Sequence, residues 1–223
     1  MKYNSCNLCQ ELAGNLIKEL GGGYPSIVSS RKNRLLESEN FVLIPSAGPL
    51  NESHAMLVPK EHVESFAALS SSMHAEAETL LSTIQNWHQL RYRKRLIFFE
   101  SGAGRLTSHS GACIIHAHIH CVTASTDFHE TLMKEVKLQP RLNNSLDINH
   151  GYIWYRDESG CDYYKNNPLL PSQFLRFTYA QCSDEPSKWN WRRYVNASGM
   201  LNVIKHYEAI AMGIAVHQKA SDH

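Results

Sequence analysis

Three histidines spaced two residues apart, His116, His118 and His120, constrain the folding of this 223-residue chain more than any other feature. Because side chains alternate between the two faces of a β-strand, residues 114–122 are predicted to form a strand with three imidazoles on one face. The other face would carry an apolar stripe: Ile115, Ala117, Ile119 and Cys121. We therefore expect a sheet that packs on a core with one face and offers the other to a ligand.

The composition is typical of a soluble globular protein, with 43% hydrophobic and 19% charged residues and a formal net charge of +1. This balance gives no global field for nucleic acid or an anionic membrane, so we expect neither partner. No run approaches the ~20 apolar residues of a membrane-spanning helix, and the first residues lack the apolar segment of a secretory signal. We expect a cytoplasmic protein, whose close cysteine pairs bind metal or carry redox chemistry rather than form structural disulfides.

The first half of the chain is predicted to contain several short strands and one long helix. Short apolar runs separated by turn-forming residues predict strands within residues 34–60 and at residues 96–99. Ser71 or Ser72 is expected to cap a helix that ends near Arg93, because its apolar residues share one helical face. A loop with three glycines follows at residues 101–111.

The sequence changes character near residue 127 and becomes richer in aromatic residues. Residues 152–155 and 161–164 predict a hairpin, and two helices are expected over residues 171–180 and 200–216. This segment is too apolar for a linker, so we expect it to pack onto the first half.

A cysteine pair near the N-terminus is a candidate metal site. Cys6 and Cys9 have the two-residue spacing that lets two thiolates reach one tetrahedral zinc ion at ~2.3 Å. Two further ligands would have to come from elsewhere, and the chain offers thirteen histidines. A thioredoxin-like redox pair is the weaker alternative, because no strand precedes the motif.

The three histidines also suggest covalent catalysis. A neutral imidazole can attack phosphorus directly if its other ring nitrogen is held by an acceptor. Neighbouring histidines and backbone N–H groups of the glycine-containing loop could bind the phosphate oxygens. A metal-dependent hydrolase is the competing interpretation, but the run lacks the aspartate of the H-x-H-x-D-H pattern.

With these pieces placed, the sequence resembles the histidine-triad (HIT) superfamily of nucleotide hydrolases and nucleotidyl transferases. Three segments in order carry the resemblance, together covering about residues 6–123. They are the C-x-x-C-x-x-x-x-G motif at residues 6–14, the H-x-L-V-x-P-K-x-H-like run at residues 54–62, and the triad strand at residues 111–122.

The resemblance implies a fold, a mechanism and a zinc site. The expected fold is α+β, with a HIT-like catalytic domain over residues 1–126, in which a long helix packs on an antiparallel sheet, and an α/β extension over residues 127–223. His118 would be the nucleophile that forms a nucleotidyl-histidine, and His120 would contact the phosphate or leaving group. Zinc-bearing relatives imply a structural zinc held by Cys6, Cys9, His62 and His116.

Departures from the family pattern leave substrate specificity open. Ser46 stands where many members carry an acidic or amide residue for the ribose, and Ala112 and Cys113 replace Gln-Ser. The predicted substrate-binding residues are Ser46, Ser110, Gly111 and Cys113. Arg176 and Arg192 are interpreted as packing and surface residues, with contact to substrate phosphates as the alternative.

His54 is interpreted as a hydrogen-bonded strand histidine, with a supporting role behind the triad as the alternative. Nine histidines, including His88 and His206, are assigned no special role.

The predicted activity is hydrolysis or transfer at the α-phosphorus of a nucleotide conjugate such as a dinucleoside polyphosphate, a phosphoramidate or a nucleotide sugar. A catalytically inactive, zinc-stabilised nucleotide-binding module is the alternative. The resemblance also implies a homodimer, although the extension could cover that surface.

Overall fold

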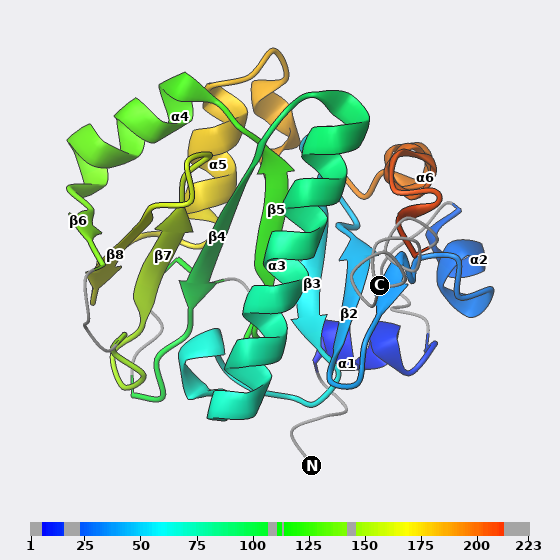
Figure 1. Cartoon of the computed structure of the whole chain (residues 1–223), viewed down its shortest axis with the longest axis horizontal. Helices are drawn as coiled ribbons and strands as arrows, with labels where there is room; N and C mark the ends of the chain where they lie inside the picture. The colour runs from blue at the N-terminus through cyan, green and yellow to red at the C-terminus, as the bar shows by residue number, and fades with distance from the viewer. Residues whose placement is uncertain (1–5, 16–22, 107–110, 113, 142–145, 212–223) are drawn as a thin grey trace, which may run out of the picture.

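One antiparallel sheet of eight strands forms the centre of the molecule (Figure 1). A computed structural model describes residues 6–15, 23–106, 111–112, 114–141 and 146–211. The strands are β1 (Leu36–Glu37), β2 (Phe41–Pro45), β3 (Ala55–Pro59), β4 (Leu96–Gly102), β5 (Ile119–Thr123), β6 (Gln139–Pro140), β7 (Tyr152–Arg156) and β8 (Asp162–Asn166). Their order is β1-β2-β3-β5-β4-β7-β8-β6, and every neighbouring pair is antiparallel.

The helices lie on both faces of this sheet, which confirms the expected α+β class. They are α1 (Asn7–Leu12), α2 (Tyr24–Ser29), α3 (Ser71–Tyr92), α4 (Thr126–Thr131), α5 (Phe174–Gln181) and α6 (Ala197–His206). The shorter helical segments are η2 (Phe66–Ala68), η3 (Leu132–Val136) and η4 (Pro186–Trp189). No helix in the described part of the chain is long and apolar enough to span a bilayer.

Helix α3 covers one face of the sheet (Figure 1). Ser70 caps it by accepting a hydrogen bond from the backbone N–H of Met73, so the cap lies one residue before the expected serines. The buried residues Ala77, Leu81 and Ile84 recur at helical spacing and pack on the core cluster of the sheet. The amphipathic pattern therefore predicted this helix and its buried face correctly.

The opposite face is covered by several shorter elements. Helices α4 and α5 bury Phe128, Leu175 and Tyr179 against β4, β5 and β7. Helix α1 buries Leu8 against β2 and β3. Because α1 and α5 come from opposite ends of the chain, this face brings the N-terminal segment and the extension to the same strands.

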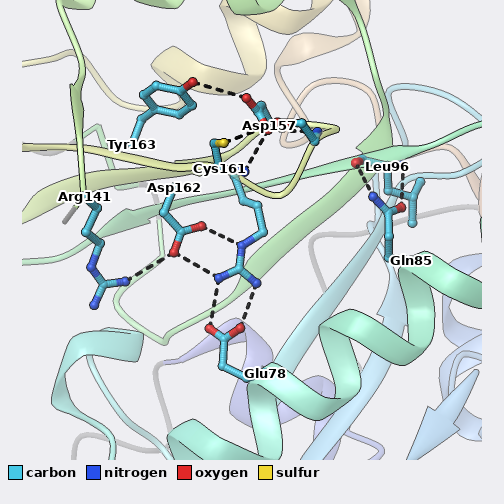
Figure 2. Close-up of polar contacts among 10 residues, drawn as sticks. Glu78, Gln85, Leu96, Arg141, Asp157, Cys161, Asp162 and Tyr163 are labelled. Atoms are coloured by element: carbon cyan, nitrogen blue, oxygen red, sulfur yellow. Dashed lines mark hydrogen bonds and ion pairs between the residues drawn. The ribbon is translucent and has the colours of Figure 1, made fainter. Parts of the chain in front are cut away.

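The extension continues the sheet of the first half. Strand β7 pairs with β4 along its whole length, and the β7–β8 hairpin forms as predicted, with Arg156 opposite Asp162. The guanidinium of Arg156 lies 2.6 Å from the carboxylate of Asp162 and 2.8 Å from that of Glu78 on α3. Figure 2 shows the carboxylates of Glu78 and Asp162 on opposite sides of the guanidinium group that both of them bind. Since Glu78 is half exposed, the ion pair orients the hairpin more than it stabilises the fold.

Several predicted boundaries were wrong. Helix α5 begins at Phe174 rather than at residue 171, α6 begins at Ala197 and ends at His206, and residues 212–216 of the expected helix lie outside the described residues. Strand β5 begins at Ile119 rather than at residue 114, and Ile115 is 55% exposed instead of lining the core.

Proline explains the shorter strand. The β3–β5 ladder ends at the Leu57–Ile119 pair; continued by two residues it would set Pro59 opposite Ala117, and a proline has no N–H to donate to a ladder. The backbone N–H of Ala117 instead bonds to the carbonyl of Val63, 2.7 Å away.

Candidate functional site

The bend before β5 separates the three histidines into two environments. His116 packs against His62, with ring centroids 4.9 Å apart, whereas His118 packs against His120, also at 4.9 Å. Simple alternation along one strand predicted one row of imidazoles. The structure instead turns one histidine toward the N-terminal cysteines and leaves two at a pocket.

Two cysteines and two histidines form the first environment, which we call the thiol–imidazole cluster. The sulfur and nitrogen atoms of Cys6, Cys9, His62 and His116 all lie within 4.8 Å of one another. The Sγ of Cys9 is 3.2 Å from Nδ1 of His62 and 3.4 Å from Nδ1 of His116. Helix α1 begins directly after Cys6, so its first turn brings both thiols toward the same point. Two sulfurs and two imidazole nitrogens are a ligand set that suits tetrahedral zinc.

Hydrogen bonding and electrostatics in the cluster also suit a cation. Nε2 of His116 donates to the carbonyl of Pro59 at 3.0 Å, which leaves the Nδ1 lone pair directed at the thiols. Burial and the neighbouring His62 and His118 lower the pKa of His116 to about 4, so its imidazole is neutral. Burial, and to a smaller extent the adjacent Cys6, raise the pKa of Cys9 to about 12, so a positive ion would be needed to stabilise its thiolate at neutral pH.

A pocket on the sheet face opposite α3 forms the second environment. The space between its walls, counted together with open solvent at its mouth, is about 650 Å³. Leu8 comes from α1, Ser46 follows β2, His120 lies on β5, and Arg176 comes from α5. The pocket therefore opens where the N-terminal segment, the sheet and the extension meet.

The hydrogen bond of His118 fixes its tautomer. Its Nδ1 donates to the carbonyl oxygen of His116 at 2.7 Å, so Nε2 carries the lone pair. Burial, and to a smaller extent the positive charge of Arg176, lower the pKa of His118 and keep it neutral. His118 lines the pocket, which places a neutral imidazole with an unprotonated nitrogen at its wall.

A chain of hydrogen bonds fixes His120 as well. The backbone N–H of Leu50 donates to Nδ1 of His54 at 3.0 Å, so the proton of His54 sits on Nε2. This Nε2 donates to Nδ1 of His120 at 2.8 Å, which places the proton of His120 on its own Nε2. Burial lowers the pKa of both histidines well below the usual value. His120 therefore offers an N–H donor beside the lone pair of His118.

The other predicted substrate-binding residues divide into two groups. Ser46 and Gly111 line the pocket together with His118 and His120. Gly111 has φ +79°, and a Cβ there would lie 3.0 Å from the carbonyl oxygen of Pro171, so this position favours glycine. Ser110 and Cys113 lie outside the described residues.

Sequence reasoning missed how closely the extension approaches the pocket. Gln173, Arg176 and Trp191 all line it, and Arg176 is 4% exposed. A Cβ on Gly48 would come within 2.9 Å of the backbone of Trp191, so glycine permits this close approach. The available signal was the spacing of Gln173 and Arg176, which puts both on one face of the predicted helix.

Comparison with known proteins gives a family for the first half of the chain. Residues 26–135 match the family described as scavenger mRNA decapping enzyme, C-terminal binding. No curated protein matches the sequence. The matched residues include His54, His62 and all three histidines at alternate positions.

Solved structures similar to this chain include several HIT family proteins. One from Bacillus anthracis has 15% sequence identity and a TM-score of 0.41, and the match covers 54% of this chain and 73% of that protein. One from Bacillus subtilis has 14% identity and a TM-score of 0.41, with 53% and 72% covered. A zinc-bound histidine triad family protein from Mycobacterium smegmatis has 18% identity and a TM-score of 0.41, with 54% and 76% covered.

Proposed function

We propose that this chain, which belongs to the histidine-triad (HIT) superfamily, cleaves or transfers a nucleotidyl group through a covalent intermediate on His118. The substrate would be a nucleotide conjugate such as a dinucleoside polyphosphate, a phosphoramidate or a nucleotide sugar. The observation that carries the proposal is the tautomer of His118, whose unprotonated Nε2 belongs to a neutral imidazole at the pocket wall.

The proposed reaction has two steps. The lone pair on Nε2 of His118 forms a bond to the α-phosphorus, and the bond from phosphorus to the leaving group breaks with its electron pair. The Nε2–H of His120 donates to a phosphate oxygen or to the leaving group, where negative charge develops. Water or another acceptor then attacks the phosphorus, the N–P bond breaks, and His118 is restored while the acceptor loses its proton to solvent.

We also propose that zinc binds the thiol–imidazole cluster and has a structural role. The ligand set and the neutral His116 support this assignment. Cys6 and Cys9 lie at the start of α1, and Leu8 between them lines the pocket, so the ion would hold one wall beside the nucleophile. Around the reacting group we propose Ser46, Ser110, Gly111 and Cys113 as substrate contacts, and we propose a homodimer, which light scattering can test.

The test is to trap the intermediate. The protein is mixed with a nucleoside 5′-phosphoramidate and quenched in alkali, because an N–P bond is labile in acid. Intact mass spectrometry should then show the wild-type chain carrying one nucleotidyl group. His118→Asn keeps an N–H that can bond to the same carbonyl but removes the nucleophile, so we expect no labelling and a loss of turnover of roughly 10³-fold or more.

His150→Asn, at an exposed histidine that is not part of the described pocket lining, is the matched control and should label like the wild type. Labelling or turnover of His118→Asn at the wild-type rate would contradict the proposal. Tight nucleotide binding without turnover of any conjugate in a broad panel would favour the inactive binding module.

A further inference from the structure

Arg176 brings a positive charge from the extension into the pocket. It lies on α5 three residues after Gln173, and both side chains line the pocket. Hydrogen bonds from the guanidinium help to hold it: Nε donates to the carbonyl of Trp189 at 2.9 Å, Nη2 to the carbonyl of Gly48 at 2.7 Å, and Nη1 to the hydroxyl of Ser46 at 3.3 Å. The charge is therefore fixed in place before any ligand arrives.

The guanidinium lies close to the proposed nucleophile but on a different part of the wall. It is near enough to lower the pKa of His118 and His120, which lie at or just before β5. Its contact with Ser46 places it at the end of β2. The pocket therefore has two anchoring points, the histidines on one strand and the Arg176–Ser46 pair beyond another.

Glu11 is the one carboxylic acid among the described residues that line the pocket, and its oxygens already have hydrogen-bond donors inside the protein. Glu11 accepts hydrogen bonds from the hydroxyl of Tyr24 at 2.7 Å and from the amide of Asn33 at 2.9 Å. Burial raises the pKa of its carboxyl, and the hydrogen bonds from Tyr24 and Asn33 act in the opposite direction. The cation at Arg176 is therefore the group in the described lining that is suited to bind an anion.

We propose that Arg176 binds a second phosphate of the substrate, one that His118 does not attack, and so selects nucleotides that carry two phosphate groups. This inference rests on the proposed function. A planar guanidinium matches the geometry of phosphate oxygens, and a buried site strengthens such charge-assisted hydrogen bonds. The second phosphate could extend the 5′ chain, as in a nucleoside diphosphate unit, or sit on the ribose.

The experiment compares three ligands that differ only in the second phosphate. Equilibrium binding to the full chain is measured for AMP, ADP and adenosine 3′,5′-bisphosphate, and for the guanosine counterparts. We expect one of the doubly phosphorylated ligands to bind the wild type about 10-fold more tightly than the monophosphate, or better. Whichever ligand shows the preference places the second phosphate on the 5′ chain or on the ribose.

Substitution of the arginine separates this role from packing. Arg176→Gln should remove the preference while changing monophosphate affinity less than about threefold, and Arg176→Lys should keep part of it because the charge remains. Arg193→Gln, at an exposed arginine of the extension, should behave like the wild type. If Arg176→Gln unfolds, the Arg176→Lys variant and the wild-type ligand ratios still decide the question.

Equal loss of affinity for mono- and bisphosphates in Arg176→Gln, or a wild type with no preference, would overturn this inference and leave the proposed function intact. A wild type that binds none of the six nucleotides would count against the proposed function itself.

Discussion

Two groups of buried or half-buried histidines in this molecule differ in how their nitrogens are used. In the first group, His54, His118 and His120, hydrogen bonds to the backbone and to one another assign the proton on each ring. In the second, His88 and His206 pack with ring centroids 5.1 Å apart between α3 and α6. Nδ1 of His88 bonds to the carbonyl of Lys94, but Nε2 of both rings has no hydrogen-bond partner among the described residues.

The difference teaches that burial and a perturbed pKa do not by themselves mark a functional histidine. Burial lowers the pKa in both groups, and it takes His206 to about 4 with help from His88 and Lys94. Only the first group combines assigned tautomers with a pocket. We therefore propose a catalytic role for the first group. We treat the second group as a structural pair that lowers the stability of the fold at acid pH.

The largest expected effect comes from the thiol–imidazole cluster that borders the first group. Cys9→Ser removes a proposed zinc ligand, and structural zinc sites contribute directly to folding. We expect the variant to lose bound zinc and roughly 4 kcal/mol or more of stability, which corresponds to about 10 °C in melting temperature for a chain of this size. Zinc per chain, measured by mass spectrometry of the metal, and thermal unfolding check the prediction.

Cys161→Ser is the matched control, because Cys161 is exposed in the β7–β8 turn and lies outside the cluster. It should retain zinc and melt with the wild type. A structural metal would be contradicted if wild-type protein contained no zinc after purification with zinc present. It would also be contradicted if the Cys9→Ser variant were as stable as the wild type.

The next effect tests the hydrogen-bond chain behind His120. His54→Phe keeps a buried ring but removes the N–H that donates to His120, so the proton of His120 is no longer confined to Nε2. We expect kcat to fall about 10–100-fold with little change in KM, as for other residues that orient a working imidazole. Steady-state kinetics with a nucleoside phosphoramidate supply the measurement.

His54→Gln is the informative partner variant, because its amide can still donate to His120, and it should recover part of the lost kcat. A His54→Phe enzyme with wild-type kcat would show that this histidine only fills space, which is the role assigned to the second group.

Much of the fold followed from sequence patterns, because those patterns report local physics. Helix α3 has a long amphipathic run and a serine cap, and the β7–β8 hairpin has alternating apolar residues around a turn. The start of β5 was missed because strand pairing depends on the partner strand, where the ladder to β5 ends at Leu57, two residues before Pro59. The residues next to the histidines do not show that a proline distant in sequence lies near them in the fold.

The candidate site, like the fold, could be predicted from the sequence only in part. The spacing of Cys6 and Cys9 and the alternate histidines pointed to residues that the fold brings together. The position of Arg176 could not be derived, because its approach to Ser46 depends on how the extension folds back across 130 residues. His54 was interpreted as an ordinary strand histidine, since only the β3–β5 pairing places it beside His120.

The smallest expected effect concerns the second group and acid. Because the folded-state pKa of His206 is about 4 while that of an ordinary histidine is 6.5, the unfolded chain binds more protons between these values. The stability contributed by the neutral pair is full above about pH 6.5 and is lost as the pH falls toward 4. His206→Phe, which can stack on Tyr92 as the imidazole does at 3.9 Å, removes this titration.

We expect the free energy of unfolding of the wild type to fall by roughly 1–2 kcal/mol more than that of the variant between pH 7 and pH 4.5, after allowance for solvent screening. Urea unfolding at the two pH values measures the difference, with His150→Gln as an exposed-histidine control. Parallel pH dependence in wild type and His206→Phe would mean that the second group finds a proton-accepting partner in the fold, and the distinction between the two groups would fail.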